Sequence, residues 1–328
     1  MRVLVTGANG FVGRILCNHL AQAGCKVRAA IHHGPAARGL ADAIETCPGL
    51  DLTNEKGWSE VLTGIDIVVH LAARAHIMHD DTDDPLAEYR RVNTQGALTL
   101  ARLAAARGVS RFVFMSSVKV NGEMTLDNPF TENDVPLPTD PYAVSKLEAE
   151  RGLAKIAAGT GLGCVVLRPP LVYGPGVKGN FLRLMMLVRR GIPLPFASLA
   201  NKRSLLYVGN LVSAIERAAT SEIAPGHTYL LSDGADVSTP QLIRLLGKAM
   251  GRKPRLMPFR PGLLLAFGKL AGRLDEMQRL TGSLQVDATR ITHELSWQPP
   301  FTLEQGIADT ARWFMAAAPA AEAGTVSP

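Results

Sequence analysis

The first thirteen residues, MRVLVTGANGFVG, constrain the fold of this chain more than any other segment. Residues 3–5 form a short apolar run rich in β-branched side chains, which is typical of a buried parallel strand. Gly7, Gly10 and Gly13 come next, and residues 14–23 have the pattern of an amphipathic helix. A glycine turn between strand and helix lets the backbone approach a diphosphate, which the helix N-terminus attracts. Glycines also serve ordinary loops, but this context predicts a dinucleotide-binding site.

Strand-like and helix-like runs alternate through the first half of the chain. We predict strands at residues 26–31, 50–52, 65–73, 111–115 and 163–168, and helices at 54–63, 85–107, 141–158 and 210–219. This alternation indicates an α/β fold with a doubly wound parallel sheet, the Rossmann architecture. From residue 174 onward, Gly-Pro and Pro-Gly pairs divide the chain into shorter elements.

The change from alternating strands and helices to shorter elements predicts two interleaved domains and a tail. The dinucleotide-binding Rossmann domain comprises residues 1–173 plus about 205–235, and a smaller substrate lobe comprises 174–204 and about 236–315. The Ala-rich tail, 316–328, is predicted to be disordered.

Composition limits the classes of partner. The 35 basic residues are spread along the chain without a dense run, so its net charge of +6 does not demand nucleic acid and suits an anionic substrate such as a sugar diphosphate. The four cysteines are scattered, without metal-like spacing, which predicts reduced thiols in a cytoplasmic protein and no metal site. The longest purely apolar run, 263–267, is far shorter than the ~20 residues of a membrane span. Core packing is our prediction for it, with a surface-associating helix as the alternative.

The end of the second predicted strand leaves the cofactor undecided between NAD and NADP. NAD-binding folds place an acidic residue there for the ribose hydroxyls, whereas this chain has Ile31, then His32 and His33, with Arg38 further on. No carboxylate is present to repel a 2′-phosphate. Exposed loop imidazoles are the alternative interpretation of the two histidines. Asp51, in the third predicted strand, is a candidate acceptor for the adenine amino group, with an exposed loop aspartate as the alternative.

A candidate catalytic trio follows the fifth predicted strand. Tyr142 and Lys146 are four residues apart on a predicted helix and therefore share a face. Free tyrosine has a pKa of about 10, and we expect the lysine cation to lower it. Ser117 ends the strand region and can hydrogen-bond the same substrate oxygen. Together these groups suit proton transfer from a hydroxyl while a hydride leaves its carbon for a nicotinamide cofactor.

These motifs together resemble the extended short-chain dehydrogenase/reductases of the NAD-dependent epimerase/dehydratase family, over residues 1 to about 314. The segments that carry the resemblance are TGANGFVG (6–13), DLTN (51–54), HLAAR (70–74), VNTQG (92–96), FMSSVKVNG (114–122), PYAVSK (141–146), RPPLVYGPG (168–176), RSLLYVGNL (203–211) and the D-x-x-R to W-x-P stretch of 287–299.

The resemblance assigns residues to three roles. The expected cofactor-binding residues are Gly7, Gly10, Phe11, Val12, Gly13, His32, Asp51, Leu52, Leu71, Ala72, Ala73, Asn93, Ser116, Tyr142, Lys146 and Pro169. The expected catalytic residues are Ser117, Tyr142 and Lys146, and the expected substrate-binding residues are Ser117, Asn180, Pro195, Arg203 and Arg279. Of the two arginines, Arg203 is expected to pair a substrate phosphate, and Arg279 is the candidate for a second phosphate or a ribose contact.

The implied activity is oxidoreduction at C4 of a UDP-hexose or UDP-N-acetylhexosamine, in surface polysaccharide precursor synthesis. Dehydration is not expected, because Ser117 is followed by Val118 and Lys119 instead of the acidic pair of the dehydratases. A 4-epimerase and an NAD(P)H-dependent 4-keto reductase use the same residues and stay undecided. A reductase of a non-nucleotide ketone and a non-catalytic dinucleotide-binding regulator are the further alternatives. The resemblance also implies a homodimer formed through helices 85–107 and 141–158.

Overall fold

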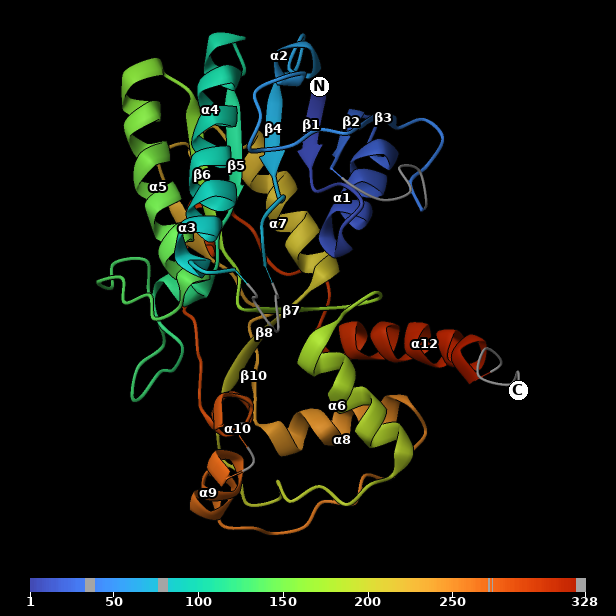
Figure 1. Cartoon of the computed structure of the whole chain (residues 1–328). Helices are drawn as coiled ribbons and strands as arrows, with labels where there is room; N and C mark the ends of the chain where they lie inside the picture. Colours follow the sequence, from blue (N-terminus) through green and yellow to red (C-terminus); the bar gives the residue numbers. More distant parts are fainter. Residues whose placement is uncertain (33–38, 76–81, 271, 273, 323–328) are drawn as a thin grey trace.

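The computed structural model describes residues 1–32, 39–75, 82–270, 272 and 274–322 (Figure 1). A seven-stranded sheet, parallel throughout, occupies the larger lobe. In spatial order its strands are β3 (Glu45–Pro48), β2 (Lys26–Ile31), β1 (Arg2–Thr6), β4 (Ile67–His70), β5 (Arg111–Met115), β6 (Gly163–Arg168) and β9 (Thr228–Leu230). Strand order reverses between β1 and β4, which is where doubly wound sheets bind ligands. The predicted α/β fold is confirmed.

Helices cover both faces of this sheet. One face carries α1 (Phe11–Gln22), α7 (Val208–Thr220) and α11 (Thr289–Leu295), and the other carries α2 (Trp58–Val61), α4 (Gly96–Ala106) and α5 (Pro141–Thr160). The alternation along β1 sends Val3 and Val5 into the first core and Leu4 into the second. All three side chains are buried. A parallel sheet covered in this way requires the continuous apolar strands that the sequence contains.

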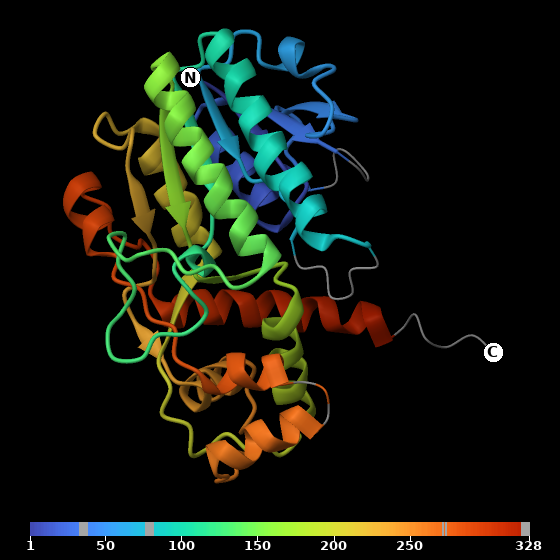
Figure 2. The same cartoon turned by 60° about the vertical axis from the view of Figure 1, so that its left-hand side comes forward.

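The smaller lobe has its own sheet and its own core. Its strands, in spatial order, are β10 (Asp236–Val237), β8 (Arg203–Tyr207) and β7 (Leu171–Tyr173). Its helices are α6 (Gly179–Arg190), α8 (Thr239–Ala249), α9 (Pro261–Leu270), α10 (Leu274–Thr281) and α12 (Leu303–Glu322). Figure 2 shows α12 crossing beneath the larger lobe. Tyr173, Phe181, Ile243 and Leu246 are buried together in this second core.

Several elements differ from the sequence-based bounds. The third strand is residues 45–48 and not 50–52, because Gly49 turns the chain with φ 77° and Asp51 then folds back onto Thr53. The predicted helix 85–107 is three segments: α3 (Pro85–Tyr89), a π-helical stretch (Arg90–Gln95) and α4. Strand β7 lies before the predicted boundary at 173 but pairs with β8 of the smaller sheet.

The C-terminal tail also differs from the expectation of disorder. Helix α12 continues to Glu322, so residues 316–322 are helical, and residues 323–328 lie outside the described part of the chain. Within the described residues, no helix has both the length and the apolar character needed to cross a bilayer.

Candidate active site

The glycine turn is packed tightly against the end of β4. Gly7 has φ 67°, and a Cβ on it would lie 2.9 Å from the Ala72 nitrogen. A Cβ on Gly13 would lie 2.2 Å from the Gly7 carbonyl oxygen, so neither position accepts a side chain. Helix α1 then begins with Gly10 as N-cap, and no side chain caps it. The turn therefore presents bare backbone and an uncapped helix N-terminus beside residues 71–72, as the sequence predicts.

Asn93 connects the end of β4 to α5. Its Oδ1 accepts from the Arg74 nitrogen at 2.7 Å, and its Nδ2 donates to the Arg74 oxygen at 3.1 Å and to Ser145 Oγ at 3.1 Å. The side chain is buried, in the π-helical stretch of residues 90–95. Asn93 therefore fixes the segment after Leu71, Ala72 and Ala73 against the helix that carries the proposed catalytic residues.

Ser117 begins a short 3₁₀ turn at the end of β5. Its Oγ accepts from the Lys119 nitrogen at 3.2 Å, and the following Val118 nitrogen donates to the Pro169 carbonyl at 3.0 Å. The Lys119 ammonium pairs with Glu123 at 2.8 Å and with Asp140, the N-cap of α5. Lys119, which stands where the dehydratases have an acidic residue, therefore links the Ser117 turn to the start of α5 through ion pairs.

Tyr142 and Lys146 lie one turn apart on α5, and their environments differ. Lys146 is 1% exposed; its Nζ donates to the Met115 carbonyl at 2.8 Å and lies 4.5 Å from the centre of the Phe114 ring. Burial lowers the Lys146 pKa to about 7, while the Glu150 carboxylate acts to raise it. Desolvation and the Asp140 carboxylate raise the pKa of Tyr142 above its ordinary value.

The expectation of a Tyr142 pKa below its ordinary value is therefore not met in this structure. The Lys146 nitrogen lies 5.9 Å from the centre of the Tyr142 ring and donates its hydrogen bond to the Met115 carbonyl. Desolvation of the phenol outweighs this weak attraction. Additional positive charge at the site is needed to bring the Tyr142 pKa towards neutrality.

Sequence reasoning missed a buried polar cluster beneath the trio. The Arg168 guanidinium forms two hydrogen bonds with the Glu150 carboxylate, at 3.0 and 2.5 Å, and a third with Asn121 Oδ1 at 3.0 Å. Ser116 donates to Glu150, and all four side chains are buried. Glu150 lies eight residues after Tyr142 and four after Lys146, a spacing that places the three on one helical face. That spacing is the signal that the sequence contained.

Two arginines that the resemblance assigned to substrate binding, Arg203 and Arg279, are in contact in the smaller lobe. The Arg203 guanidinium donates to the Arg279 carbonyl at 2.7 Å and to the Gly282 carbonyl at 3.2 Å. Burial and the neighbouring Arg279 charge lower the pKa of Arg203. Two like charges held close together favour an anion between them. Asn180 lies in the first turn of α6, and Pro195 is partly exposed in the loop after that helix.

The expected adenine-side residues are only partly described. Asp51 Oδ1 accepts from the Thr53 nitrogen at 2.8 Å and from its hydroxyl at 2.9 Å, and the backbone bond is the main cause that lowers the Asp51 pKa. His32 is exposed, with Nδ1 3.1 Å from the Leu50 oxygen. His33 and Arg38 lie outside the described residues. The same edge of the sheet also carries Leu52, next to Asp51.

The residues at this edge fit a dinucleotide. The turn at Gly7 and Gly13 is too tightly packed against its own backbone to hold a Cβ, and the N-terminus of α1 supplies backbone N–H groups beside it. Ser117 lies just after the neighbouring strand β5, and Lys146 on α5 contacts the last residue of that strand. Among the described residues, no group of three or more His, Cys, Asp or Glu side chains is arranged to hold a metal ion.

Comparison with known proteins identifies a family and several relatives. The model of the NAD dependent epimerase/dehydratase family matches residues 3–232. The chain is 42% identical over 323 residues to the UDP-glucose 4-epimerase of Vibrio cholerae, with 96% of each chain covered. It is 28% identical over 328 residues to N-acetyl-alpha-D-glucosaminyl-diphospho-ditrans,octacis-undecaprenol 4-epimerase of Escherichia coli O157:H7, over 95% of this chain and 94% of the relative.

A solved structure extends the similarity to three dimensions. The UDP-glucose 4-epimerase of Thermus thermophilus, in complex with NAD, has a TM-score of 0.78 and 25% identity, covering 97% of this chain and 100% of its own. The family model spans well over half of the chain and includes the glycine turn, Ser117, Tyr142 and Lys146. The chain belongs to the NAD-dependent epimerase/dehydratase family.

Proposed function

We propose that this protein is a nucleotide-sugar 4-epimerase that inverts C4 of a UDP-hexose or UDP-N-acetylhexosamine. The observation that carries the proposal is the 42% identity to a UDP-glucose 4-epimerase across 96% of both chains. The placement of Ser117, Tyr142 and Lys146 at one edge of the sheet supports it, since these groups suit the chemistry.

The roles of the chain's residues follow from their positions. Tyr142 takes the proton of the C4 hydroxyl and later returns it, while the Ser117 hydroxyl hydrogen-bonds the same oxygen. Lys146, when protonated, stabilises the phenolate. The bound nicotinamide supplies the hydride acceptor and donor for C4. Arg203 and Arg279 bind the substrate diphosphate, with Asn180 and Pro195 along the nucleotide.

We propose NAD, held by the glycine turn, as the cofactor. The Thermus thermophilus epimerase with NAD supports this choice, and an epimerase regenerates its cofactor within each turnover. The absence of a carboxylate at Ile31 is the observation that keeps NADP as the second candidate. His32 follows Ile31 directly, and Asp51 follows the neighbouring strand β3.

Two other functions are less well supported. A non-catalytic regulator would not need the trio that this chain retains. A reductase of a non-nucleotide ketone would not need the paired arginines Arg203 and Arg279. The Escherichia coli relative bears the name of a 4-epimerase of an undecaprenol-linked diphospho-sugar, so a lipid-linked diphosphate is the second substrate class to test.

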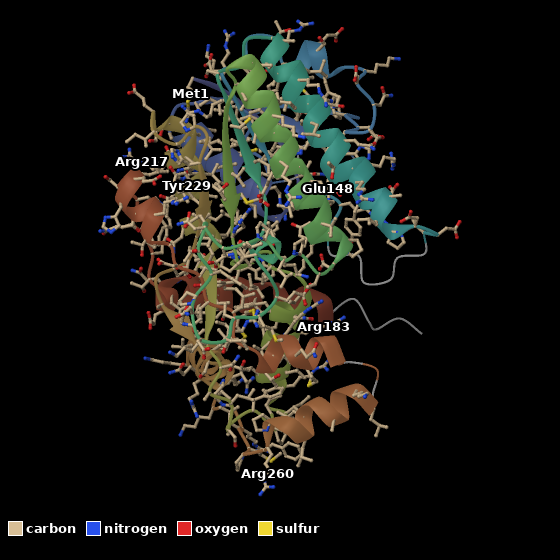
Figure 3. All side chains as sticks on the ribbon, turned by 90° about the vertical axis from the view of Figure 1, so that its left-hand side faces the viewer. Met1, Glu148, Arg183, Arg217, Tyr229 and Arg260 are labelled. Carbon is tan, nitrogen blue, oxygen red and sulfur yellow. The ribbon has the colours of Figure 1, made fainter. Side chains whose placement is uncertain are left out.

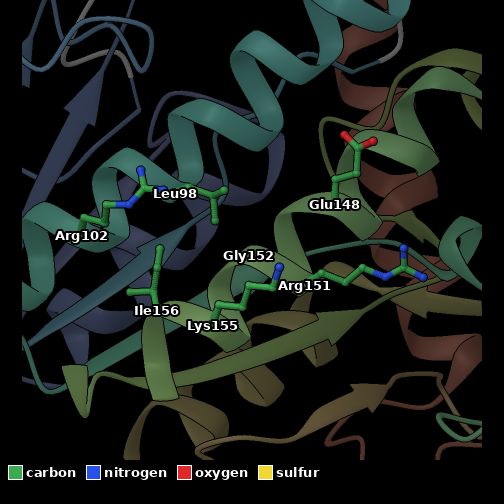
Figure 4. A pocket seen from close by; sticks show the side chains of 7 residues that line it. All are labelled: Leu98, Arg102, Glu148, Arg151, Gly152, Lys155 and Ile156. Atoms are coloured by element: carbon green, nitrogen blue, oxygen red, sulfur yellow. The ribbon is translucent and has the colours of Figure 1, made fainter. Parts of the chain in front are cut away.

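We also propose a homodimer formed through α4 and α5. A cavity of about 460 Å³ lies on the outer face of these helices (Figure 4), lined by Leu98, Arg102, Glu148, Arg151, Gly152, Lys155 and Ile156. Gly152 allows close packing there, because a Cβ would lie 2.5 Å from Leu98 Cδ2. Light scattering of the purified protein tests the proposal, and a Leu98→Asp variant should be monomeric.

The decisive experiment combines cofactor analysis with an epimerisation assay. The purified protein is denatured, and the released nucleotide is identified by mass and absorbance. Intact protein is then incubated with UDP-glucose, UDP-N-acetylglucosamine or a polyprenyl-diphosphate N-acetylglucosamine without added cofactor, and the epimer is measured. Stoichiometric NAD and conversion of one substrate support the proposal. No epimer, with NADPH oxidised by a 4-keto nucleotide sugar, would instead identify a reductase.

A further inference from the structure

The positive charge of one segment of the smaller lobe exceeds the net charge of the whole chain. Residues 237–274 include eight Lys and Arg and no Asp or Glu. Because the net charge of the chain is +6, the remaining residues carry a net charge of −2. The segment comprises α8, the loop that follows it and α9.

The described cations of this segment are exposed and have no acidic partner. Seven of the eight are described in the structure, and all seven are exposed: Arg244, Lys248, Arg252, Lys253, Arg255, Arg260 and Lys269. None of these side chains forms an ion pair or a hydrogen bond within the described part of the chain. Several basic residues of the larger lobe are paired instead, since Arg90, Lys119 and Arg168 each contact a carboxylate.

Apolar side chains are exposed among these cations. Met257 is 47% exposed, Leu263 is 49% exposed and Leu270 is 87% exposed. Leu263 and Leu270 are seven residues apart on α9 and therefore share one face of that helix. Leu264 is buried, so another side of α9 is anchored in the lobe. A basic surface with leucines on one helical face is the composition of an interfacial membrane segment.

This surface lies at the far end of the smaller lobe. Figure 3 shows Arg260 at the end of the molecule opposite Met1. The loop before it is fixed to the lobe, because Leu194 donates to the Arg255 carbonyl at 2.8 Å and accepts from the Met257 nitrogen at 2.9 Å. The loop of residues 255–257 is therefore hydrogen-bonded to the loop that carries Pro195.

We propose that this surface, residues 244–270, docks the protein peripherally on an anionic lipid bilayer. The Lys and Arg side chains contact phosphate headgroups, while Leu263, Leu270 and Met257 enter the boundary between headgroups and acyl chains. A single-stranded nucleic acid is a less suitable partner, because base stacking needs exposed aromatic side chains and Phe259, the aromatic residue whose side chain is described in this segment, is only partly exposed. The proposal concerns binding and does not depend on the epimerase activity.

The test measures co-sedimentation of the full-length protein with vesicles. Vesicles of phosphatidylcholine alone are compared with vesicles containing about one quarter phosphatidylglycerol. We expect binding only to the anionic vesicles, and weaker binding at high salt because exposed charges are screened. The triple variant Arg252→Gln, Lys253→Gln, Arg260→Gln should bind at least about tenfold more weakly, since each cation near the surface contributes to the attraction.

Matched controls separate this surface from net charge and from general hydrophobicity. Arg2, Lys26 and Lys56 are exposed at the opposite end of the molecule, and changing all three to Gln should leave binding unchanged. The double variant Leu263→Ser, Leu270→Ser should weaken binding by about three- to tenfold. The corresponding changes at Leu126 and Val135, which are 89% and 87% exposed, should have no effect.

Two results would overturn the proposal. One is equal binding of the native protein and the Arg252/Lys253/Arg260 variant to anionic vesicles. The other is retention of single-stranded RNA by the native protein with no sedimentation on vesicles, which would assign the surface to nucleic acid. Far-ultraviolet circular dichroism and thermal melting verify that every variant is folded, and all substituted side chains are exposed.

Discussion

The proposed catalytic edge of the parallel sheet (Ser117, Tyr142 and Lys146) and the arginine corner of the smaller lobe (Arg203 and Arg279) differ in how charged side chains are neutralised. At the catalytic edge, charged side chains are paired: Glu150 with Arg168, and Lys119 with Asp140. At the corner, the Arg203 guanidinium donates to the backbone carbonyls of Arg279 and Gly282 and has no carboxylate partner among the described residues. The ion pairs of the catalytic edge neutralise each other within the protein and hold the proposed catalytic groups in place. The uncompensated positive charge of the corner favours an anionic ligand. The first should control turnover and stability, and the second substrate affinity.

The largest effect on turnover should come from Tyr142. The Tyr142→Phe variant keeps the ring, which packs edge-on against Tyr89 at 6.2 Å, but loses the proton-transferring hydroxyl. We expect kcat to fall by about 100- to 10,000-fold, with cofactor content and substrate KM nearly unchanged. Steady-state kinetics and measurement of bound nucleotide test this. A variant with near-native turnover would show that another group moves the proton.

Glu150 tests whether the buried pairs support the chemistry as well as the fold. Glu150→Gln leaves the Arg168 guanidinium buried without its counter-charge, which should lower the free energy of unfolding by about 3 kcal/mol. Because the Glu150 carboxylate raises the Lys146 pKa, its loss should move that pKa below about 7. The high-pH limb of the kcat profile should then shift to lower pH.

The matched variant Arg168→Gln separates these two effects. It breaks the same ion pair, but it leaves the Glu150 carboxylate near Lys146. We expect a similar loss of stability in chemical denaturation, without the downward shift of the kcat profile. Identical profiles for the two variants would mean that Glu150 has only a structural role.

The sequence was most informative where local pattern and tertiary contact agree. Strands 26–31, 111–115 and 163–168 have the predicted bounds, because apolar runs between turn residues determine them. The π-helical stretch at residues 90–95 and the pairing of β7 with β8 depend on long-range packing, which local periodicity does not contain.

The same distinction applies to the candidate site. The motif spacing identified the glycine turn, whereas the contact between the Arg203 guanidinium and the Arg279 carbonyl is known only from the structure. The Glu150–Arg168 pair joins α5 to the end of β6, and the direction of the Tyr142 pKa shift depends on burial. The basic surface of residues 244–270 was missed because its cations are dispersed, and only the lack of acidic residues among them separates it from the rest of the chain.

His70 provides a test of the catalytic edge that depends on pH. Its Nδ1 lies 2.8 Å from Thr6 Oγ1, and its Nε2 is buried without a hydrogen-bond partner among the described residues. Burial, and then the Lys146 charge, lower the His70 pKa from 6.5 to about 3. The unfolded chain therefore binds this proton between about pH 6.5 and pH 3 while the folded chain does not, so stability falls as pH decreases through that range.

We expect the His70 contribution to the unfolding free energy to decrease by about 2 kcal/mol between pH 7 and pH 5. The His70→Asn variant retains an acceptor for Thr6 but does not titrate. Its stability should be less dependent on pH over this interval in urea titrations. Parallel curves for the two proteins would mean that His70 is not held neutral in the fold.

Arg203 tests the other side of the comparison and should give the smallest effect. The Arg203→Ala variant removes one cation from the corner and relieves its repulsion with Arg279, so stability should change little. The loss of a charge-assisted hydrogen bond to a phosphate should raise KM for the nucleotide sugar about tenfold, with kcat within about threefold of native. Arg203→Lys, which keeps a point charge without the planar fork, should recover only part of the affinity. If Arg203→Ala instead lowered kcat and left KM unchanged, the corner would act on the chemical step. The assignment of turnover to the catalytic edge and of substrate affinity to the corner would then be wrong.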